Sequence, residues 1–434
     1  MNEQTEIKTA SAGPVQKRIA VVGGGLAGLV AANVAARAGA KVTLFEGAKS
    51  LGGRALTTEH EGFHINMGPH ALYAAGAANK ILKELGVEPK GAMPVLEGTT
   101  AIFGGEKYRL PVSIKSVLLS RFLGLKDKLE ILGFYGKLPK LDAVDFQHVT
   151  QKEFVETICK RPRARHYVNA MCRLGSYCNA PELLSAEIAI SQLKLGLSGV
   201  LYIDKGWATL VDALAEKARA SGVEVITGQK INSILNAGQK IEIKSAKGDL
   251  GSFESAILCV PPNIATGLCA KSDCLSSEWS ETVPVRAACL ELALSTLPVE
   301  DAVFALGMDE NSYFSVHSKT AKLAPEGGAL IQAALYTPAG EKAATNSRDL
   351  LEKLVSQMQP GWEDHIVHAI YRPQALVSQM LPLATKGGSS GRPKVSQPNN
   401  IYLAGDWVGD EGHLSDAAVA SAKKAATLAV RQMV

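Results

Sequence analysis

The sequence predicts an α/β protein whose chain opens with a βαβ unit, and neighbouring segments near the start carry this prediction. Residues 17–22 (KRIAVV) are apolar and β-branched, as a buried parallel strand requires. A glycine-rich run, 23–28, follows at once and opens the Ala-rich, helix-prone stretch 29–38. A second strand-like run, 41–45 (KVTLF), ends at Glu46. This order of strand, glycine turn, helix and strand within about 30 residues is typical of a dinucleotide-binding unit.

The glycine run satisfies the pattern GxGxxG, and the spacing of its glycines has a mechanical purpose. Gly23 permits the tight turn, Gly25 lets a pyrophosphate approach the backbone, and Gly28 lets the helix pack closely on the strand. The helix N-terminus, around Leu26 and Ala27, offers free N–H groups and the positive end of its dipole to the phosphates. The run therefore predicts a phosphate-binding turn.

Glu46 closes the second strand, where a carboxylate can accept hydrogen bonds from both ribose hydroxyls of an adenosine. An acid at this position disfavours NADP, because it would repel the 2′-phosphate. The unit therefore predicts a Rossmann-like fold that binds NAD or FAD. The glycine motif alone does not separate these two cofactors.

Two further segments distinguish FAD from NAD. Gly52, Gly53 and Arg54 form a second small-residue turn that is followed by a cation. Near the end of the chain, residues 400–409 (NIYLAGDWVG) read as a strand ending in Gly-Asp, and an Ala-rich helix follows at 414–426. In both segments the chain resembles the FAD-dependent amine oxidase, phytoene desaturase and protoporphyrinogen oxidase superfamily. Its motif style is nearest to the phytoene-desaturase-like oxidoreductases.

The resemblance implies FAD as the cofactor and a Rossmann-like FAD/NAD(P)-binding domain of the glutathione-reductase-like FAD family, with an inserted substrate domain. It places Gly52 and Gly53 against the flavin nucleotide, Arg54 near the phosphates, and Asp406 beside ribityl or pyrophosphate oxygens. The final helix would point its N-terminus at the flavin, which suits the negative charge of the reduced ring. The other cofactor-binding positions that the resemblance implies are Gly68, Pro69, His70, Ile231, Gly405, Leu414 and Ser415.

We expect two discontinuous domains, because the matched motifs are spread along the chain. The first insert between them has the apolar spacing of helices, and the second begins with strand-like runs and closes with a helical one. The substrate domain is therefore predicted as an antiparallel sheet over the flavin, with helices behind it. The predicted segments are a disordered tail at 1–16, an FAD domain at 17–75, 205–265 and 396–434, and a substrate domain at 76–204 and 266–395.

No catalytic dyad is recognisable in the sequence, and flavin chemistry does not require one. A flavin accepts a hydride at N5, so the protein has chiefly to hold the substrate C–H over that atom and exclude water. The resemblance puts His70, Tyr73 and Trp407 near the ring as candidate catalytic residues. For each of them, packing against the cofactor is an equal alternative to proton transfer.

The leading hypothesis is an FAD-dependent dehydrogenase or desaturase that acts on an apolar, isoprenoid-type substrate. One alternative is an amine oxidase that releases peroxide, with an amine held between Trp407 and one of Tyr202, Tyr313 or Tyr371. A protoporphyrinogen-oxidase-like enzyme and a flavin-binding redox module without turnover are further alternatives. A second GxGxxG motif is missing from the sequence, which disfavours disulfide-reductase chemistry.

Composition limits the partners and the compartment. A net charge of +4, with no nucleic-acid-binding pattern, argues against DNA or RNA as a partner. The seven cysteines form no CxxC pair, so we expect reduced thiols, no metal site and a cytoplasmic protein, as a monomer or homodimer. The polar start of the chain is not a secretion signal, and no apolar run predicts a membrane-spanning helix.

One basic and apolar stretch bears on membrane contact. Residues 110–141 mix Leu, Ile, Val and Phe with six cations and only two acids. Two ordinary amphipathic helices that cap the substrate domain are the favoured interpretation. The alternative is a surface for peripheral membrane contact, since apolar residues framed by basic ones favour an anionic interface. The nearby run 160–166 (KRPRARH) is interpreted as a solvated basic loop.

Overall fold

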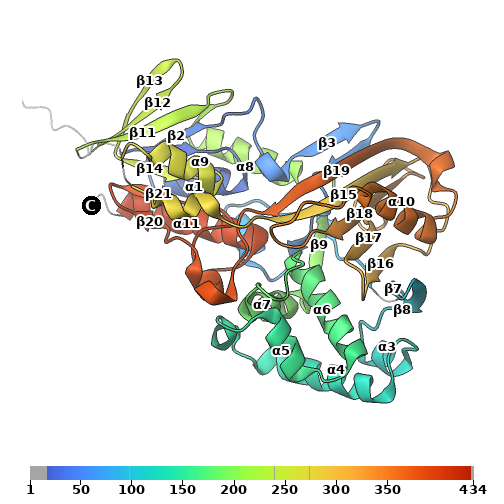
Figure 1. The fold of residues 1–434 in the computed structure, drawn as a ribbon. Helices are drawn as coiled ribbons and strands as arrows, with labels where there is room; N and C mark the ends of the chain where they lie inside the picture. Colours follow the sequence, from blue (N-terminus) through green and yellow to red (C-terminus); the bar gives the residue numbers. More distant parts are fainter. Residues whose placement is uncertain (1–16, 97, 239, 273, 432–434) are drawn as a thin grey trace, which may run out of the picture.

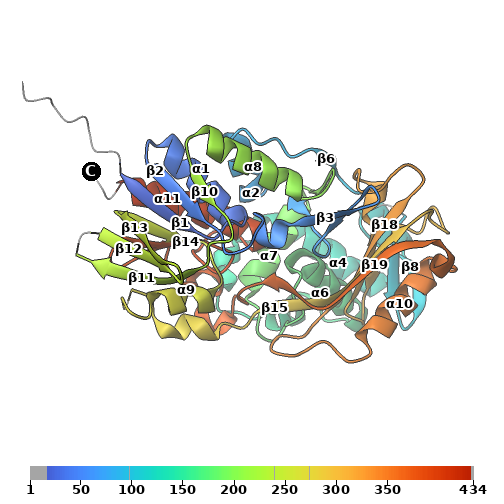
Figure 2. The ribbon, with the colours of Figure 1, turned by 90° about the horizontal axis from the view of Figure 1, so that it is seen from above.

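The computed structural model describes residues 17–431 apart from 97, 239 and 273, so the predicted tail at 1–16 lies outside the described residues. The chain has a mixed α/β fold. Figures 1 and 2 show a sheet-and-helix lobe that contains the first strands and the last helix, a second large sheet beside it, and a lobe of helices.

The first lobe is built on a six-stranded sheet whose strands come from the start, the middle and the end of the chain. The strand order is β10-β2-β1-β14-β21-β20, and all neighbouring pairs are parallel except β20 with β21. The central strand β1 is buried on both faces from its second residue onward, as its β-branched sequence predicts. The strands are β1 (Arg18–Val22), β2 (Lys41–Phe45), β10 (Glu224–Ile226), β14 (Ser255–Leu258), β20 (Ser396–Gln397) and β21 (Ile401–Leu403).

Helices pack on this sheet, as expected from the βαβ pattern of the sequence. α1 follows β1 directly, and it packs against the last helix, α11, which closes the lobe. Ala residues line both helices, so their backbones approach closely. The helices of this lobe are α1 (Leu26–Arg37), α2 (Ala77–Glu84), α8 (Ala208–Ala220), α9 (Pro262–Cys269) and α11 (Leu414–Arg431).

The second sheet has seven strands in the order β19-β15-β18-β17-β16-β7-β8. It corrects the prediction of a purely antiparallel sheet, because β7 pairs in parallel with β16. α10 (Ser347–Met358) packs on the apolar face of this sheet, as predicted for a helix there. The strands are β7 (Thr100–Phe103), β8 (Glu106–Arg109), β15 (Val285–Leu294), β16 (Phe304–Gly307), β17 (Ser312–Val316), β18 (Ala329–Tyr336) and β19 (Ile366–Ser378).

The helical lobe contains the basic run that the sequence suggested to be a loop. That interpretation was wrong, because residues 162–166 form the first turns of α6, with Pro162 at a first-turn position that suits its missing N–H. The run is still solvated, as expected: Arg163 is exposed and the Arg165 side chain is 37% exposed, although each also donates to a backbone carbonyl. The helices of this lobe are α3 (Ile114–Leu119), α4 (Leu125–Lys137), α5 (Gln151–Ile158), α6 (Pro162–Ser176) and α7 (Ala186–Gly196).

Three short sheets complete the fold. A hairpin of β3 and β4 leaves the first lobe, and β9 pairs with both β5 and β6. The antiparallel sheet of β11, β12 and β13 packs on the first lobe. These strands are β3 (Thr57–His60), β4 (Phe63–Asn66), β5 (Leu72–Tyr73), β6 (Gly91–Ala92), β9 (Val200–Ile203), β11 (Ile231–Ala237), β12 (Lys240–Ser245) and β13 (Gly248–Phe253).

All seven cysteines lie in the described part of the chain, and none of them forms a disulfide. Within residues 17–431, apart from the three omitted positions, no helix combines the length and apolar character needed to cross a bilayer.

Candidate functional site

The glycine turn between β1 and α1 has the geometry that the motif requires. Gly23 has a φ of +107°, and a Cβ there would lie 2.4 Å from the carbonyl oxygen of Cys259. A Cβ on Gly28 would lie 1.8 Å from the carbonyl oxygen of Gly23, so the helix can approach the turn only without one. Gly25 is different, because the nearest atom to its added Cβ would be the Gly52 oxygen at 3.8 Å. Two glycines therefore serve packing, while Gly25 borders open space that a ligand could occupy.

Glu46 is oriented by backbone donors on both carboxylate oxygens. The amide of Gly24 donates to Oε2 at 2.6 Å, and the amide of Ala48 donates to Oε1 at 2.7 Å. The amide of Gln229 also donates to the Glu46 carbonyl, which brings the buried Ile231 at the start of β11 close to this end of the site. Each carboxylate oxygen keeps a further lone pair, so Glu46 could accept hydrogen bonds from two ribose hydroxyls.

The second glycine turn lies against the first. The amide of Gly52 donates to the Gly24 carbonyl at 2.8 Å, and Gly25 and Gly52 form an isolated parallel bridge. Gly53 has a φ of +54°, and its added Cβ would be 3.6 Å from the Gly25 Cα. Small residues thus line both sides of the turn at which the sequence predicts a pyrophosphate.

Arg54 joins this turn to the C-terminal motif. Its Nη1 and Nη2 lie 2.8 Å from the two carboxylate oxygens of Asp406, and Nη1 also donates to the Val377 carbonyl. The Asp406 side chain is 1% exposed, whereas that of Arg54 is 37% exposed. Burial opposes ionisation of Asp406, but the Arg54 guanidinium, together with hydrogen bonds from the Gln379 amide and Ser378, holds the pKa of that carboxyl below its usual range. A fixed ion pair therefore lies where the resemblance predicts ribityl or pyrophosphate contacts.

The turn of Gly68, Pro69 and His70 lies next to this pair. Ring nitrogen Nδ1 of His70 contacts the Gly68 carbonyl at 2.9 Å, and Nε2 contacts the Arg54 carbonyl at 3.1 Å. Burial lowers the pKa of His70 below that of a solvated imidazole. Both ring nitrogens face backbone carbonyls, and a neutral imidazole donates to one of them, so His70 ties the turn to the backbone in this structure.

Glu291 on β15 is a buried carboxyl that the sequence analysis did not single out. It is fully buried, it accepts a hydrogen bond from the Gly68 amide, and its Oε2 lies 3.1 Å from Nε of Arg372. Burial raises the pKa of Glu291 to about 7, despite the opposing effects of Arg372 and the amide. The sequence signal that could have identified Glu291 is a single acid within the apolar run ACLELAL of β15.

Two of the predicted catalytic candidates have structural contacts. The hydroxyl of Tyr73 donates to the Gly175 carbonyl at 2.7 Å, and burial raises its pKa. Trp407 is 1% exposed, and its Nε1 donates to the Val260 carbonyl at 3.1 Å within the core of the first lobe. These contacts favour packing over proton transfer for both side chains.

The suggested amine cage is not assembled around Trp407, because its indole is buried in the core. Tyr371 lies beside α10, where its hydroxyl is 2.7 Å from Oγ of Ser347. Trp407 packs in the core of the first lobe, whereas Tyr371 packs with the second sheet and α10, so each ring is held by its own surroundings.

A cluster of rings instead lies on the second sheet and on β9, which pairs with Leu72 and Tyr73 of β5 at the end of the turn at residues 67–73 (the residue 67–73 turn). His317 stacks on Tyr202 at 3.9 Å, and its Nε2 is 3.0 Å from the hydroxyl of Tyr313. Tyr177 and Tyr336 meet edge to face at 6.1 Å. Burial raises the pKa of all four phenols and lowers the pKa of His317 to about 3, so these rings are uncharged near neutral pH. We call these five residues the aromatic cluster.

The last helix begins beside the same region. Leu414 has a φ of +53°, and Leu414 and Ser415 open α11 after the strand that ends before Gly405. Asp416 in the first turn accepts a hydrogen bond from the Ala78 amide at 2.8 Å, and burial raises its pKa to about 6. The amides of Asp416 and Ala417 donate to the His413 carbonyl, so it is the positive end of the α11 dipole that could stabilise negative charge on a bound group.

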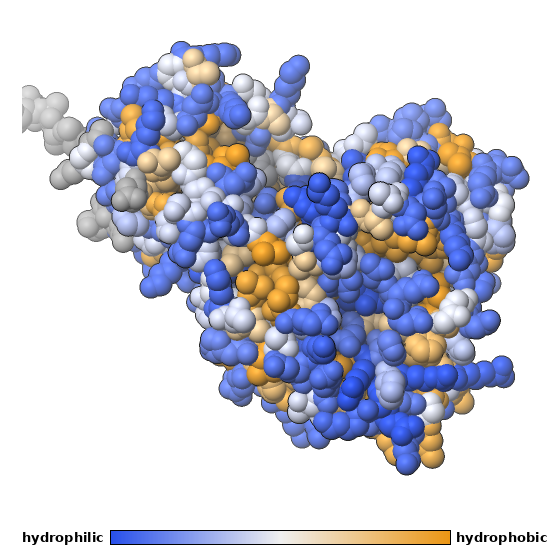
Figure 3. Space-filling model, viewed as in Figure 1, coloured by the Kyte–Doolittle hydropathy of each residue, from blue (hydrophilic) through white to orange (hydrophobic). Residues whose placement is uncertain are grey.

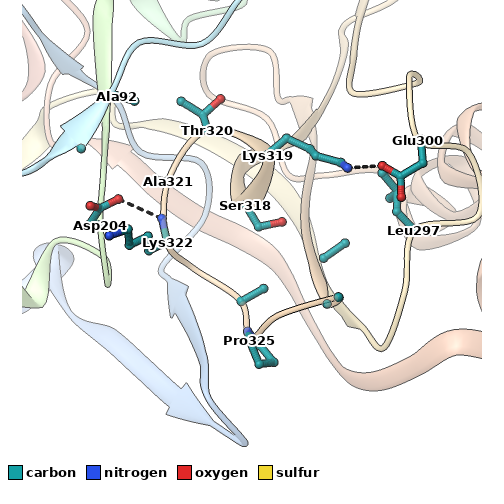
Figure 4. A pocket seen from close by; sticks show the side chains of 15 residues that line it. Ala92, Asp204, Leu297, Glu300, Ser318, Lys319, Thr320, Ala321, Lys322 and Pro325 are labelled. Atoms are coloured by element: carbon teal, nitrogen blue, oxygen red, sulfur yellow. Dashed lines mark hydrogen bonds and ion pairs between the residues drawn. The ribbon is translucent and has the colours of Figure 1, made fainter.

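A pocket of about 510 Å³ lies elsewhere, at the ends of β9, β15 and β18 (Figure 4). Three of its charged groups are engaged: Lys319 pairs with Glu300, and Asp204 accepts from the Lys322 amide. None of the residues predicted to bind the cofactor lines it. Its lining also includes Gly91, Ala92, Leu297, Ser318, Thr320 and Pro325.

Comparison with known proteins identifies the family. The profile described as flavin containing amine oxidoreductase matches residues 26–284, more than half of the chain. The chain belongs to the flavin containing amine oxidoreductase family. It is similar to 4,4'-diapolycopen-4-al dehydrogenase of Metabacillus indicus, with 22% identity over 89% of this chain and 92% of the relative.

Solved structures of other proteins share the fold of this chain. An oxidoreductase from Methanosarcina mazei superposes with a TM-score of 0.72 and 18% identity, over 94% of this chain and 99% of the other. A double mutant of putrescine oxidase superposes with a TM-score of 0.75 and 17% identity, over 96% of this chain and 99% of the other. The protein is therefore an FAD-dependent oxidoreductase, as the sequence predicts.

Proposed function

We propose that this flavoenzyme is a dehydrogenase or desaturase that takes a hydride from an uncharged, apolar substrate of the isoprenoid class. The name of the relative from Metabacillus indicus, 4,4'-diapolycopen-4-al dehydrogenase, supports both the reaction type and the substrate class. The observation that carries the proposal is the uncharged aromatic cluster beside the residue 67–73 turn.

We propose that the first lobe is a Rossmann-like domain of the glutathione-reductase-like FAD family. Glu46 would accept the adenosine ribose hydroxyls, and the pyrophosphate would cross between Gly25 and Gly53. Arg54 and Asp406 would contact the phosphate and ribityl oxygens. The continuous path of contacts from Gly24 through Gly52 and Arg54 to Asp406 supports this arrangement. The remaining proposed positions are Gly23, Leu26, Ala27, Gly28, Gly68, Pro69, His70, Ile231, Gly405, Leu414 and Ser415.

The protein's part in catalysis would be to bind, orient and exclude water. The flavin supplies N5 as the hydride acceptor. The aromatic cluster would pack against the substrate and keep solvent from the reacting carbon, and the α11 N-terminus would stabilise the charge that the reduced cofactor carries. Glu291 and Arg372 would hold the residue 67–73 turn through the Gly68 amide.

The charges of this region favour a neutral substrate over an amine. An ammonium group would need a free carboxylate or an aromatic cage. Glu291 is one buried acid beside the turn, and it is already paired with Arg372 and the Gly68 amide. Asp416 is another, and it accepts from the Ala78 amide while its burial disfavours the charged form. The rings of Tyr177 and Tyr336 meet edge to face, so they do not present two parallel walls.

Product analysis would test the substrate class. Purified holoenzyme would be incubated with an apolar polyisoprenoid in detergent, with primary amines, and with porphyrinogens, each with an artificial electron acceptor. The proposal predicts a product with one further double bond from the polyisoprenoid alone. Turnover of an amine with release of peroxide, and no turnover of the polyisoprenoid, would overturn it.

A further inference from the structure

The helices α3 and α4 expose apolar side chains that an ordinary amphipathic helix would bury. Ile114, Leu118, Leu119, Leu125 and Leu129 are between 53% and 75% exposed. Ile114 and Leu118 are one turn apart on α3, and Leu125 and Leu129 are one turn apart on α4, so they form two short ridges. The favoured interpretation of two ordinary capping helices does not account for this outer face.

The ridges are held facing outward. Val117 of α3 and Ile131 and Phe134 of α4 are buried in the hydrophobic core of the helical lobe. The Lys128 ammonium donates to the Leu118 carbonyl at 2.7 Å, which ties α4 to α3. The helices therefore present their exposed side chains on one supported surface, at the end of the lobe labelled α3 and α4 in Figure 1.

The exposed charged side chains of residues 110–141 beside these ridges are positive. The two acids of residues 110–141 are turned to structural contacts: Asp127 is buried and accepts from the Gly124 amide, and Glu130 accepts from the Lys160 and Arg161 amides. In Figure 3 apolar atoms reach the surface at the lower right of the molecule, with hydrophilic atoms around them. The exposed cations beside the ridges are Lys115, Arg121 and Lys126.

We propose that this α3–α4 patch, the five apolar side chains with Lys115, Arg121 and Lys126, docks on the surface of a bilayer that contains anionic lipids. Leucine side chains would enter the boundary between headgroups and acyl chains, while the cations contact lipid phosphates and carboxylates. A second copy of the chain is a poorer occupant, because a symmetric contact would bring like charges together.

Helix α6 connects the α3–α4 patch with the aromatic cluster. Nη1 of Arg163, in the first turn of α6, donates to the Phe122 carbonyl at 2.9 Å, between α3 and α4. The other end of α6 leads into Tyr177 of the aromatic cluster. The lobe that would touch lipid is therefore the lobe that carries Tyr177, one of the rings proposed to pack against the substrate. The docking itself does not depend on the substrate, and it can be measured without one.

Vesicle sedimentation of the full-length holoenzyme tests the proposal. We expect binding to phosphatidylserine–phosphatidylcholine vesicles that weakens with added salt, and weaker binding to phosphatidylcholine alone. Leu119→Ser combined with Leu125→Ser should weaken binding about tenfold, because each leucine contributes by burial of apolar area. Lys115→Gln combined with Lys126→Gln should remove the preference for phosphatidylserine.

Leu350→Ser combined with Ile366→Ser is the matched control, since both side chains are exposed but lie on the second sheet and its helix. Its vesicle binding should equal that of the unmodified protein, and flavin content and thermal unfolding should be unchanged in all three variants. Absence of vesicle binding, an equal loss in the control, or a concentration-dependent dimer that only the leucine variant dissociates would overturn the proposal.

Discussion

The guanidinium of Arg54 lies 2.8 Å from both carboxylate oxygens of Asp406, although the two residues are 352 positions apart in the chain. This pair joins the turn after the first βαβ unit to the Gly-Asp motif before the last helix. Both ends of the proposed cofactor site are therefore fixed by one contact, which makes the pair the first place to test.

Arg54→Met should weaken FAD binding at least about tenfold and lower the free energy of unfolding by about 1–3 kcal/mol, because the buried Asp406 carboxylate loses its cation. Isothermal titration of the apoprotein and urea unfolding would measure the two effects. Arg348→Met is the control, since its pair with Glu352 is exposed and should change stability by less than about 0.5 kcal/mol. Unchanged FAD affinity in Arg54→Met would contradict the proposed role.

Gly25→Ala should abolish FAD binding without unfolding the protein. Its added methyl has space in the protein, with the nearest atom at 3.8 Å, but it would occupy the place proposed for the pyrophosphate. Gly267→Ala in α9 also adds a methyl in open space, and it should bind FAD normally. Circular dichroism and flavin fluorescence would follow both variants. Full flavin content in Gly25→Ala would show that the pyrophosphate does not cross there.

Stability should decrease with rising pH because of Glu291. The folded protein raises the pKa of this carboxyl from 4.5 to about 7, so it binds more protons than the unfolded chain between these values. The contribution of this group is present below about pH 4.5 and is lost as the pH rises towards 7. Glu291→Gln should remove this part of the slope in urea unfolding measured from pH 5 to 8. An identical slope in the variant would refute the assignment.

Trp407→Phe should affect stability rather than the rate of flavin reduction. The change removes the hydrogen bond to the Val260 carbonyl in a buried site, which should cost about 1–3 kcal/mol of unfolding free energy. The rate of anaerobic flavin reduction should stay within about twofold of the unmodified enzyme. A large loss of rate with unchanged stability would restore Trp407 as a catalytic candidate.

Local sequence signals predicted those parts of the fold that depend on neighbouring residues. The turn at Gly23, the close packing at Gly28 and the helix after Leu414 follow from short-range sterics, so their sequence patterns were sufficient. The basic run at 160–166 was misread because its cations were weighed without the apolar spacing that follows. Ala164, Tyr167 and Val168, at positions i, i+3 and i+4, are buried on the inner face of α6, and this spacing already indicated a helix.

Contacts between distant segments could not be predicted in the same way. The parallel pairing of β7 with β16 joins Ala101 to Leu306, and no local pattern specifies a partner 205 residues away. Glu291 depends on both Gly68 and Arg372, which lie on separate elements. The buried position of Trp407 likewise depends on Val260, so the motif around it did not reveal which way the indole points.

Anaerobic reduction of the bound flavin is the most direct test of the central claim, that the enzyme takes a hydride from an uncharged apolar substrate. Holoenzyme would be mixed with a polyisoprenoid in detergent, and the visible flavin absorbance would be followed without oxygen. We predict that the absorbance bleaches and that one flavin is reduced for each double bond formed. A flavin that stays oxidised with the polyisoprenoid but is bleached by a primary amine would contradict the claim.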